Sequence, residues 1–439
     1  MCGKYSPSCS PPRMAARDHA RGECASVSIE KAVYGGLTRT HLDDGTLVFA
    51  GNAIEGEQGT VELQYRKKNI WFARMADIAA PSADRIPAPC QFADRCGGCQ
   101  LQHMAYPAQV AMKRKIVEEA LYHEGVPLPS DIRVHAMEHP WAYRYRGEFH
   151  VVPGDAGMGD ARLGFNEHRR WVPVAVDDCL IHHPTIRSAL PELVELVQRG
   201  GLSGLSTLHC TVGEHGQELL IRAKPFGMVR DDVLEEIALR SDSSVRWSTD
   251  ATTLHWRTFA FRITPDTFIQ VNWEMMDTLY QCVLDAVAES HAHTILDAYA
   301  GIGVMSSAFA AAGADVTCIE SNPASVHLGM LNSRMNALEK RLHFVRGSVE
   351  DVLAEHLSKT VDHAVLDPPR SGCEPRVVGA LVLQGPQHVT YVSCNPSTLA
   401  RDLHVLAASG PYVPTRMDIV DMFPHTYHVE TVVHLMREG

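Results

Sequence analysis

Residues 294–321 read TILDAYAGIGVMSSAFAAAGADVTCIES, and this stretch decides the fold. An apolar strand pattern, TILDAY, leads into a glycine turn, a helical pattern follows, and DVTCIES forms a second strand pattern. Strand, helix and strand in this order predict a parallel crossover of the right-handed kind. Because the alternation continues from about residue 265 to the end, the sequence predicts a doubly wound parallel α/β sheet.

The glycine turn predicts a ligand site. Gly301 and Gly303 follow the first strand, where main-chain amides can approach a ligand without interference from a Cβ atom. Glu320 ends the next strand, 19 residues after Gly301, which suits an acidic side chain that binds ribose hydroxyls. The stretch contains neither GxxxxGK[ST] nor a complete GxGxxG, so a phosphate-binding loop is disfavoured. The pattern favours a nucleoside cofactor without phosphates, such as S-adenosylmethionine, over a tight turn that binds nothing.

Three segments near the end of the chain predict covalent catalysis. SCNPSTLARD places Cys394 directly after the apolar run HVTYV, at the carboxyl end of a predicted strand. LDPPRSG supplies Asp367, and DMFPHTYHVE ends in the carboxylate of Glu430. A single cysteine is as often a small buried apolar residue, and Glu430 alone could be a surface charge. The combination favours a nucleophile with a partner base.

These groups suit methyl transfer to carbon 5 of uracil. Carbon 5 becomes nucleophilic only after a thiolate has added to carbon 6, which is the role expected of Cys394. The proton on carbon 5 must then leave, which is general-base work for Glu430, while Asp367 could hold the uracil imide edge. Enzymes of this sheet type that methylate amino groups commonly have an aromatic residue where this chain has Arg370, so ring-carbon chemistry is favoured.

The linked motifs resemble those of the RNA (uracil-5-)methyltransferase family. The resemblance runs from about residue 27 to the end and is closest to members that combine an N-terminal β-barrel of the TRAM type with an iron–sulfur cluster and modify 23S ribosomal RNA. It rests on CGGCQLQH, FIQVN, LDAYAGIG, DPPRSG, SCNPSTLARD and DMFPHTYHVE.

The resemblance implies roles for individual residues. Cys394 corresponds to the nucleophile and Glu430 to the base. The implied contacts to S-adenosylmethionine are Gln270, Tyr299, Gly301, Glu320, Ser348 and Asp367. Ala300 stands where the family usually has cysteine, and Val304 where a polar residue is common, so the cofactor pocket is expected to differ in detail.

Four cysteines predict a metal centre. Cys90, Cys96 and Cys99 form a C-x5-C-x2-C run, and Cys179 follows far along the chain. By spacing, the set could hold an iron–sulfur cluster, or zinc with help from the histidines at 182 and 183. The family resemblance selects a [4Fe–4S] cluster with a structural role.

The predicted fold is therefore multidomain α/β. It comprises an N-terminal OB-like barrel, a central α+β region with the iron–sulfur site, and a C-terminal Rossmann-like methyltransferase sheet. The expected ranges are a disordered extension at 1–25, the barrel at 26–86, the central region at 87–264 and the methyltransferase domain at 265–439.

Composition is compatible with RNA as the partner. The chain of 439 residues has a net charge of −12, but residues 1–170 hold 21 basic and 20 acidic residues, so local basic strips remain available. RKK at 66–68, KRK at 113–115 and YRYR at 143–146 are candidates, although each could be an ordinary solvated face. No secretory or membrane-spanning pattern is evident, so a cytoplasmic enzyme without an obligate protein partner is expected.

Two other classes of function remain open from the sequence. One is a non-catalytic RNA-binding or assembly protein that retains the fold, to which the acidic charge and Ala300 give mild support. The other is a methyltransferase that acts on a base nitrogen or a protein amide. Cys394 and Glu430 argue against the first, and Arg370 with the thiol argues against the second. Transfer RNA is the alternative substrate to ribosomal RNA.

Overall fold

A computed structural model describes residues 19–155, 157–200, 207–213, 216–224, 232–233, 236, 246–248, 250–357 and 360–438. The chain divides into two compact units. The first comprises Met1–Pro87 with His103–Ala105, and the second comprises Ala88–Gln102 with Tyr106–Gly439. Most of the predicted N-terminal extension, residues 1–18, lies outside the described residues.

The first unit is a six-stranded sheet in the order β1-β5-β6-β4-β3-β2. Its side chains alternate between buried and exposed, as the sequence pattern predicts, and Val48, Val61, Leu63 and Trp71 form its core. The strands are β1 (Cys24–Ser28), β2 (Lys31–Val33), β3 (Leu37–His41), β4 (Leu47–Gly51), β5 (Gln58–Lys67) and β6 (Ile70–Ala80). The strand β1 begins two residues before the predicted boundary at 26.

The second unit contains a central sheet in the order β10-β9-β8-β11-β12-β13. All its strand pairs are antiparallel except β12 with β13, which are parallel. The strands are β8 (Arg146–Gly154), β9 (Gly157–Asn166), β10 (Pro173–Ala175), β11 (Thr207–Val212), β12 (Glu218–Lys224) and β13 (Arg246–Ser248). Helices α2 (Pro184–Ser188) and α3 (Leu190–Gly200) pack against this sheet, and β14 (Thr252–Trp256) forms a hairpin with β15 (Phe259–Ile263).

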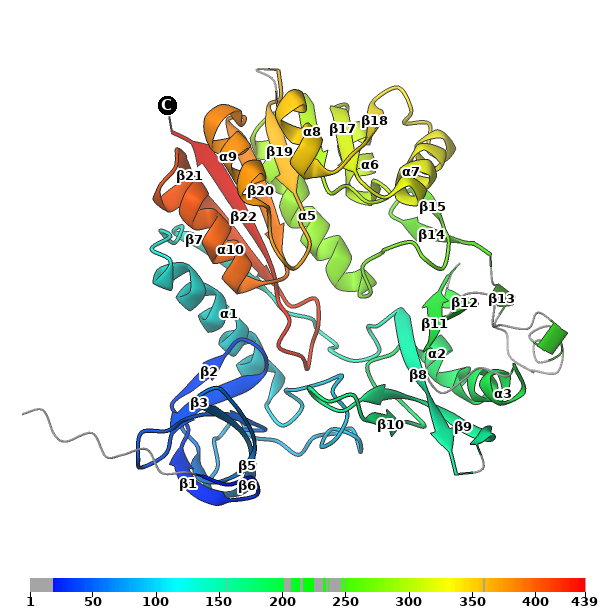
Figure 1. Cartoon of the computed structure of the whole chain (residues 1–439). Helices are drawn as coiled ribbons and strands as arrows, with labels where there is room; N and C mark the ends of the chain where they lie inside the picture. Colours follow the sequence, from blue (N-terminus) through cyan, green and yellow to red (C-terminus); the bar gives the residue numbers. More distant parts are fainter. Residues whose placement is uncertain are drawn as a thin grey trace, which may run out of the picture. The chain divides into compact units, whose positions relative to one another are not determined.

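The larger sheet has eight strands in the order β18-β17-β16-β19-β20-β22-β21-β7, with helices packed on it (Figure 1). Five neighbouring strands are parallel, as the alternation of strands and helices predicts, and β22 runs antiparallel to both of its neighbours. The strands are β7 (Asp131–His135), β16 (Thr294–Ala298), β17 (Asp315–Glu320), β18 (Leu342–Arg346), β19 (His363–Leu366), β20 (His388–Ser393), β21 (Tyr412–Val420) and β22 (Glu430–Arg437).

The sequence patterns predict the first three helices of this sheet but not the last three. The helices are α5 (Trp273–Glu289), α6 (Val304–Ala311), α7 (Pro323–Met335), α8 (Val349–His356), α9 (Pro375–Gln384) and α10 (Pro396–Leu403), which continues into the π-helical turn η2 (His404–Ala408). None of the helices among the described residues combines the length and apolar character that a membrane crossing requires.

The division at residue 265 differs from the structure in one respect. Strand β7 lies within the predicted central region, yet it pairs in parallel with β21 at the edge of the large sheet. Helix α1 (Tyr106–His123) also packs on α10 of that sheet. The reason is burial, since Val117 and Leu121 of α1 join the same apolar core as Tyr391 of β20.

Candidate active site

The glycine turn between β16 and α6 has the backbone that the sequence predicts. Tyr299, Gly301 and Gly303 adopt positive φ values of 66°, 58° and 75°. A Cβ atom added at Gly303 would come within 2.8 Å of the Phe344 ring, whereas one added at Gly301 would meet no atom within 4 Å. Gly303 is therefore required by packing, and Gly301 borders open space beside the strand ends.

Glu320 lies at the carboxyl end of β17 and is held next to this turn. Its Oε2 atom accepts a hydrogen bond of 3.0 Å from the Gly301 amide, and its Oε1 atom accepts one of 2.7 Å from the Asn322 amide. These bonds fix the carboxylate where the open sheet would bind a ribose.

Two further carboxyl groups give this part of the sheet an excess of hydrogen-bond acceptors. Asp297 on β16 is buried, its Oδ2 accepts from the hydroxyl of Ser306, and its Oδ1 atom has no hydrogen-bond partner among the described residues. Burial raises the pKa of Asp297 to about 7 and the pKa of Asp367 to about 6. These carboxyl groups suit a ligand that carries hydroxyls, an amine and a positive charge, as S-adenosylmethionine does.

Two of the remaining expected cofactor residues, Tyr299 and Ser348, have partners within the protein. The Tyr299 hydroxyl donates to Glu350 at 2.8 Å. Ser348 caps α8, because its Oγ accepts from the Asp351 amide at 3.2 Å. Gln270 is half-buried just before α5. Their contact with the cofactor therefore stays a prediction.

Cys394 lies between the end of β20 and the start of α10. Asn395 caps that helix, with its side chain accepting from the Ser397 amide. The Arg370 carbonyl accepts hydrogen bonds from the Asn395 side chain at 3.1 Å and from the Thr398 hydroxyl at 3.3 Å. The DPPRSG segment and the cysteine are thereby joined at one edge of the sheet.

Strand pairing brings Glu430 to the same edge. Ser393 pairs with Thr431 in the antiparallel β20–β22 ladder, so the preceding residue of β22, Glu430, lies beside the residue that follows β20, Cys394. The Glu430 side chain is only 5% exposed. The structure therefore brings together the three groups that the sequence selects, a thiol and the carboxyls of Glu430 and Asp367, which influence one another electrostatically.

Burial and neighbouring carboxyl groups oppose ionisation of Cys394 and Glu430, whereas the Arg370 cation favours it. Burial and the Glu430 carboxylate raise the pKa of the Cys394 thiol to about 11, against the opposing effect of Arg370. Burial and the neighbouring Asp367 also raise the pKa of Glu430 well above its usual range, again against the effect of Arg370. Arg370 is the group whose electrostatic role the sequence did not assign, although its position in DPPRSG was visible.

The segment that leads to Glu430 is firmly anchored. Lys113 of α1 is 2% exposed and forms an ion pair of 2.5 Å with Asp421. The His425 amide donates to the Gln109 side chain at 3.0 Å, and the Tyr143 hydroxyl donates to the Pro424 carbonyl at 3.0 Å. Helix α1 and the segment before β8 thus hold the residues that precede Glu430.

A pocket of about 360 Å³ lies next to this segment. Its wall combines arginines, histidines and aromatic rings from the cysteine segment, the central region and the large sheet. The lining residues are Gly97, Gly98, Gln100, Arg144, His168, Arg169, Arg370, Phe423, Thr426, Tyr427 and His428. Burial lowers the pKa of His428 to about 3, with help from Arg370, so the positive charge of the pocket resides on its arginines. No sequence motif marked His168 or Arg169, which lie between β9 and β10.

The four predicted metal cysteines gather in the second unit. The Cys99 thiol interacts electrostatically with Cys96 and Cys90, and the Cys179 thiol interacts with Cys99 and Cys96. Burial raises the pKa of Cys99 and of Cys179 to about 12. Among the described residues, these thiols do not form a group of three within 4.8 Å of one another.

The basic strips are only partly available for RNA. Residues 66–68 are exposed on the first unit. In the strip at 113–115, Lys113 is buried against Asp421, whereas Arg114 and Lys115 are exposed. In YRYR, the Arg146 guanidinium donates to the carbonyls of Thr267 and Pro265, whereas Arg144 lines the pocket.

Comparisons with known proteins show which proteins this chain resembles. A family model described as tRNA (Uracil-5-)-methyltransferase matches residues 245–438. An uncharacterized RNA methyltransferase of Gloeobacter violaceus is 32% identical over 451 residues, which cover 95% of this chain and 97% of the relative. One from Listeria monocytogenes is 31% identical over 433 residues, covering 89% and 93%.

One solved structure is similar over nearly the whole chain. It is the tRNA (uracil-54, C5)-methyltransferase of Pyrococcus abyssi in complex with S-adenosyl-L-homocysteine, with a TM-score of 0.72 and 23% identity. The similarity covers 93% of this chain and 99% of that one. At this identity, it shows a shared fold.

Proposed function

Since this chain belongs to the RNA (uracil-5-)methyltransferase family and is an RNA methyltransferase, we propose that it methylates carbon 5 of a specific uridine through a covalent bond to Cys394. The observation that carries the proposal is the strand register that sets Cys394 beside Glu430, with Asp367 and Arg370 close by. S-adenosylmethionine, when bound, supplies an electrophilic methyl group.

The chain's residues account for each bond change. The Cys394 thiolate forms a bond to carbon 6 of uracil and moves an electron pair to carbon 5. Carbon 5 takes the methyl group from the sulfonium. Glu430 then removes the carbon 5 proton, and the returning electron pair breaks the bond between sulfur and carbon 6. The cysteine and the glutamate are both regenerated after the glutamate releases its proton.

Two features favour formation of the thiolate despite its burial. Cys394 directly precedes the N-cap of α10, where the helix dipole stabilises a negative charge. Arg370 opposes the burial that raises the pKa of this thiol. The raised pKa of Glu430 makes its carboxylate, once ionised, a stronger base for the proton on the methylated carbon.

The cofactor-binding proposal rests on the edge of β16 and β17. Gly301 and Glu320 suit the ribose, and Asp367, at the end of β19, suits the polar edge of the uracil or the cofactor. Gln270, Tyr299 and Ser348 complete the proposed set by family resemblance.

We propose 23S ribosomal RNA as the substrate. The support is the combination of an N-terminal β unit with four gathered cysteines, which is typical of the family members that modify that RNA. Transfer RNA is the second candidate, which the description of the family model and the substrate of the Pyrococcus abyssi enzyme favour. The arginines and rings of the pocket would hold phosphates and unstacked bases of either RNA. A cytoplasmic location stays a prediction.

The four cysteines fit a [4Fe–4S] cluster better than a single zinc ion. Four thiolates on one zinc ion lie only about 3.8 Å apart, because Zn–S bonds are about 2.3 Å long. Among the described residues, the four thiols interact electrostatically but form no group of three within 4.8 Å, so they do not have the spacing of a zinc site. The cluster would be held by Cys90, Cys96, Cys99 and Cys179 and would order the pocket wall at Gly97 and Gly98.

The test is tritium release from RNA labelled at carbon 5 of uridine. We expect release by the native protein and none by Cys394→Ala, and we expect a stable protein–RNA adduct with 5-fluorouridine RNA, because fluorine cannot leave as a proton. Ribosomal and transfer RNA transcripts tested in parallel identify the substrate. Methyl transfer without tritium release would indicate a nitrogen methyltransferase, and RNA binding without methylation would indicate an assembly protein; either result contradicts the proposal.

A further inference from the structure

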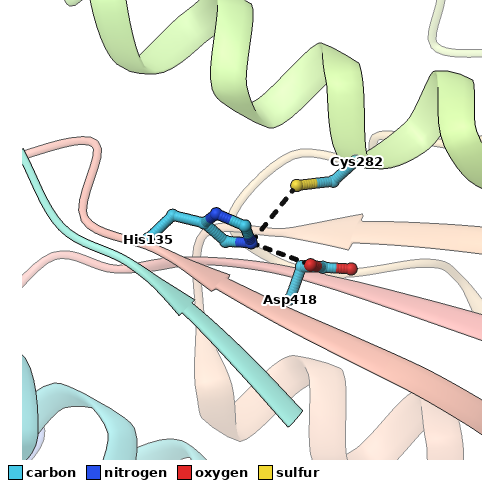
Figure 2. Close-up of side chains that lie close together, drawn as sticks. All are labelled: His135, Cys282 and Asp418. Carbon is cyan, nitrogen blue, oxygen red and sulfur yellow. Dashed lines mark hydrogen bonds and ion pairs between the residues drawn. The ribbon is translucent and has the colours of Figure 1, made fainter. Parts of the chain in front are cut away.

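Three side chains with metal-binding atoms, none of them from the four-cysteine set, meet beneath α5. His135 comes from β7, Cys282 from α5 and Asp418 from β21 (Figure 2). The His135 Nε2 atom is 2.8 Å from Asp418 Oδ1 and 3.6 Å from Cys282 Sγ. All three donor atoms lie within 4.8 Å of one another.

The sheet geometry explains why these residues meet. In the parallel β21–β7 pair, Asp418 lies opposite Arg133 and Val420 lies opposite His135. Because side chains two residues apart share a face, His135 and Asp418 project to the same face. Helix α5 packs on β21 and β22 and presents the buried Cys282 to that face.

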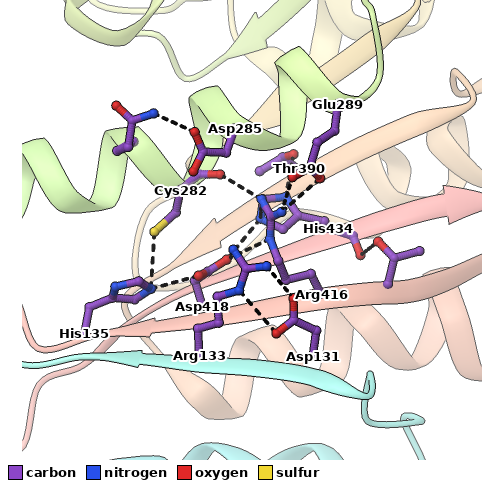
Figure 3. A network of polar contacts seen from close by, with 12 residues as sticks. Asp131, Arg133, His135, Cys282, Asp285, Glu289, Thr390, Arg416, Asp418 and His434 are labelled. Atoms are coloured by element: carbon purple, nitrogen blue, oxygen red, sulfur yellow. Dashed lines mark hydrogen bonds and ion pairs between the residues drawn. The ribbon is translucent and has the colours of Figure 1, made fainter.

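The second oxygen of Asp418 is already oriented by neighbours. Asp418 Oδ2 accepts from Arg416 Nε at 3.2 Å and lies 3.3 Å from His434 Nε2 (Figure 3). Arg416 in turn donates to both carboxylate oxygens of Glu289, at 2.7 and 2.9 Å. A carboxylate held in this way on one oxygen is the usual outer support of a metal ligand.

We propose that His135, Cys282 and Asp418 bind one divalent transition-metal ion, for which Zn²⁺ is the best match. A thiolate and an imidazole select zinc and its neighbours over Mg²⁺ and Ca²⁺, which prefer oxygen ligands. Three protein ligands leave a fourth position for water. His135 has 29% of its side chain exposed, which gives the ion a route from solvent.

The distances are close to those of a tetrahedral zinc ion. Bonds of about 2.3 Å to sulfur and about 2.0 Å to nitrogen set these atoms roughly 3.6 Å apart, and the Cys282–His135 distance is 3.6 Å. The His135–Asp418 distance of 2.8 Å would have to widen by about half an ångström, as the hydrogen bond between them is replaced by two bonds to the ion.

The charges also balance. The ion carries two positive charges, the Cys282 thiolate and the Asp418 carboxylate carry two negative charges, and Arg416 is neutralised by Glu289. Cys282 releases its proton to solvent as its sulfur binds the ion. Burial raises the pKa of this thiol to about 12, so without metal it stays protonated. The site would join β7, α5 and β21, three segments far apart in the sequence.

Titration of the purified full-length protein with Co²⁺ tests this site. We expect one tight equivalent that produces a near-ultraviolet thiolate-to-cobalt absorption band, removed on addition of one equivalent of Zn²⁺. Cys282→Ser should lose the band, and His135→Gln, at a partly exposed position, should weaken Co²⁺ binding at least about tenfold.

Two matched variants separate this site from other thiols. Cys210→Ser removes a buried cysteine of the central sheet and should keep the band. Cys99→Ser removes a thiol of the four-cysteine set and should also keep it. The proposal is overturned if the native protein shows no saturable band, if Cys99→Ser abolishes it, or if Cys282→Ser and His135→Gln both retain it.

Discussion

Asp418 and Glu430 are two buried carboxyl groups on neighbouring strands, and their surroundings give them opposite chemistry. Val420, two residues after Asp418, pairs directly with Glu430 in the β21–β22 ladder. Asp418 is 1% exposed and Glu430 is 5% exposed. Burial would raise the pKa of both, but hydrogen bonds from His135 and His434 and the charge of Arg416 hold the pKa of Asp418 well below its usual range.

Among the residues that the structure describes, Glu430 has no comparable set of donors, and burial and Asp367 hold its pKa well above the usual range. The difference shows that burial alone does not decide whether a carboxyl group is charged. The partners decide it: Asp418 belongs to a network that stabilises its charge, whereas Glu430 remains a group that can change protonation during a reaction.

The largest expected effect concerns the thiol beside Glu430. Cys394→Ala should reduce methylation by more than about a thousandfold, because an alanine side chain cannot add to carbon 6. Cys210→Ser, in the central sheet, should retain native turnover. Turnover is measured with tritium-labelled RNA. Near-native activity of the alanine variant would show that Cys394 is not the nucleophile.

Replacing the Glu430 carboxyl by an amide should separate two reaction steps. Glu430→Gln should slow product release about a hundredfold or more, since the carbon 5 proton is no longer removed, and the RNA should accumulate on Cys394. The adduct is measured by denaturing gel electrophoresis. The amide lacks the charge that burial disfavours, so the variant should not be less stable than the native protein. Fast turnover without an adduct would assign the base elsewhere.

The same carboxyl-to-amide change at Asp418 should act on stability instead. Asp418→Asn removes the negative charge that faces Arg416 and two histidines, so it should lower the unfolding free energy by about 3–5 kcal/mol. Denaturant unfolding of metal-free protein measures the loss. Asp266→Asn, at an exposed ion pair with Arg222, is a control expected to lose less than about 1 kcal/mol. Equal losses of unfolding free energy in both variants would contradict a stabilising role of the Asp418 network.

The pH–rate profile tests the cation at the reactive edge. Arg370→Gln should shift the alkaline rise in methylation to higher pH and lower the rate near neutrality about tenfold, since Arg370 lowers the pKa of the Cys394 thiol. Arg376→Gln, which removes an exposed arginine paired with Asp351, is the matched control. An unchanged profile for Arg370→Gln would show that another group favours the thiolate.

The smallest effect is a pH dependence of stability with opposite signs at the two carboxyls. The folded-state pKa of Glu430 is raised, so ionisation of this carboxyl lowers the unfolding free energy of the native protein as the pH rises above about 4.5. Glu430→Gln cannot ionise, so its unfolding free energy should exceed that of the native protein in this range. The folded-state pKa of Asp418 is lowered, so the penalty of Asp418→Asn should be complete above pH 3.8 and diminish below it. Unfolding curves at several pH values measure both trends.

The sequence by itself predicts the parallel sheet, the Gly301 turn with Glu320, and the position of Cys394 at a strand end. These features depend on local periodicity and on the rule that parallel strands present their carboxyl ends at one edge, so a single chain reveals them. One further antiparallel strand pair, β20 with β22, brings Cys394 next to Glu430.

Only the tertiary structure decides which side chains are buried together and what charges surround them. It moves β7 into the large sheet, buries Lys113 against Asp421, and brings His135, Cys282 and Asp418 into one group. No local pattern encodes such contacts, because their partners lie more than a hundred residues apart in the chain. Burial and charge depend on the complete set of neighbours, and that set exists only after the chain has folded.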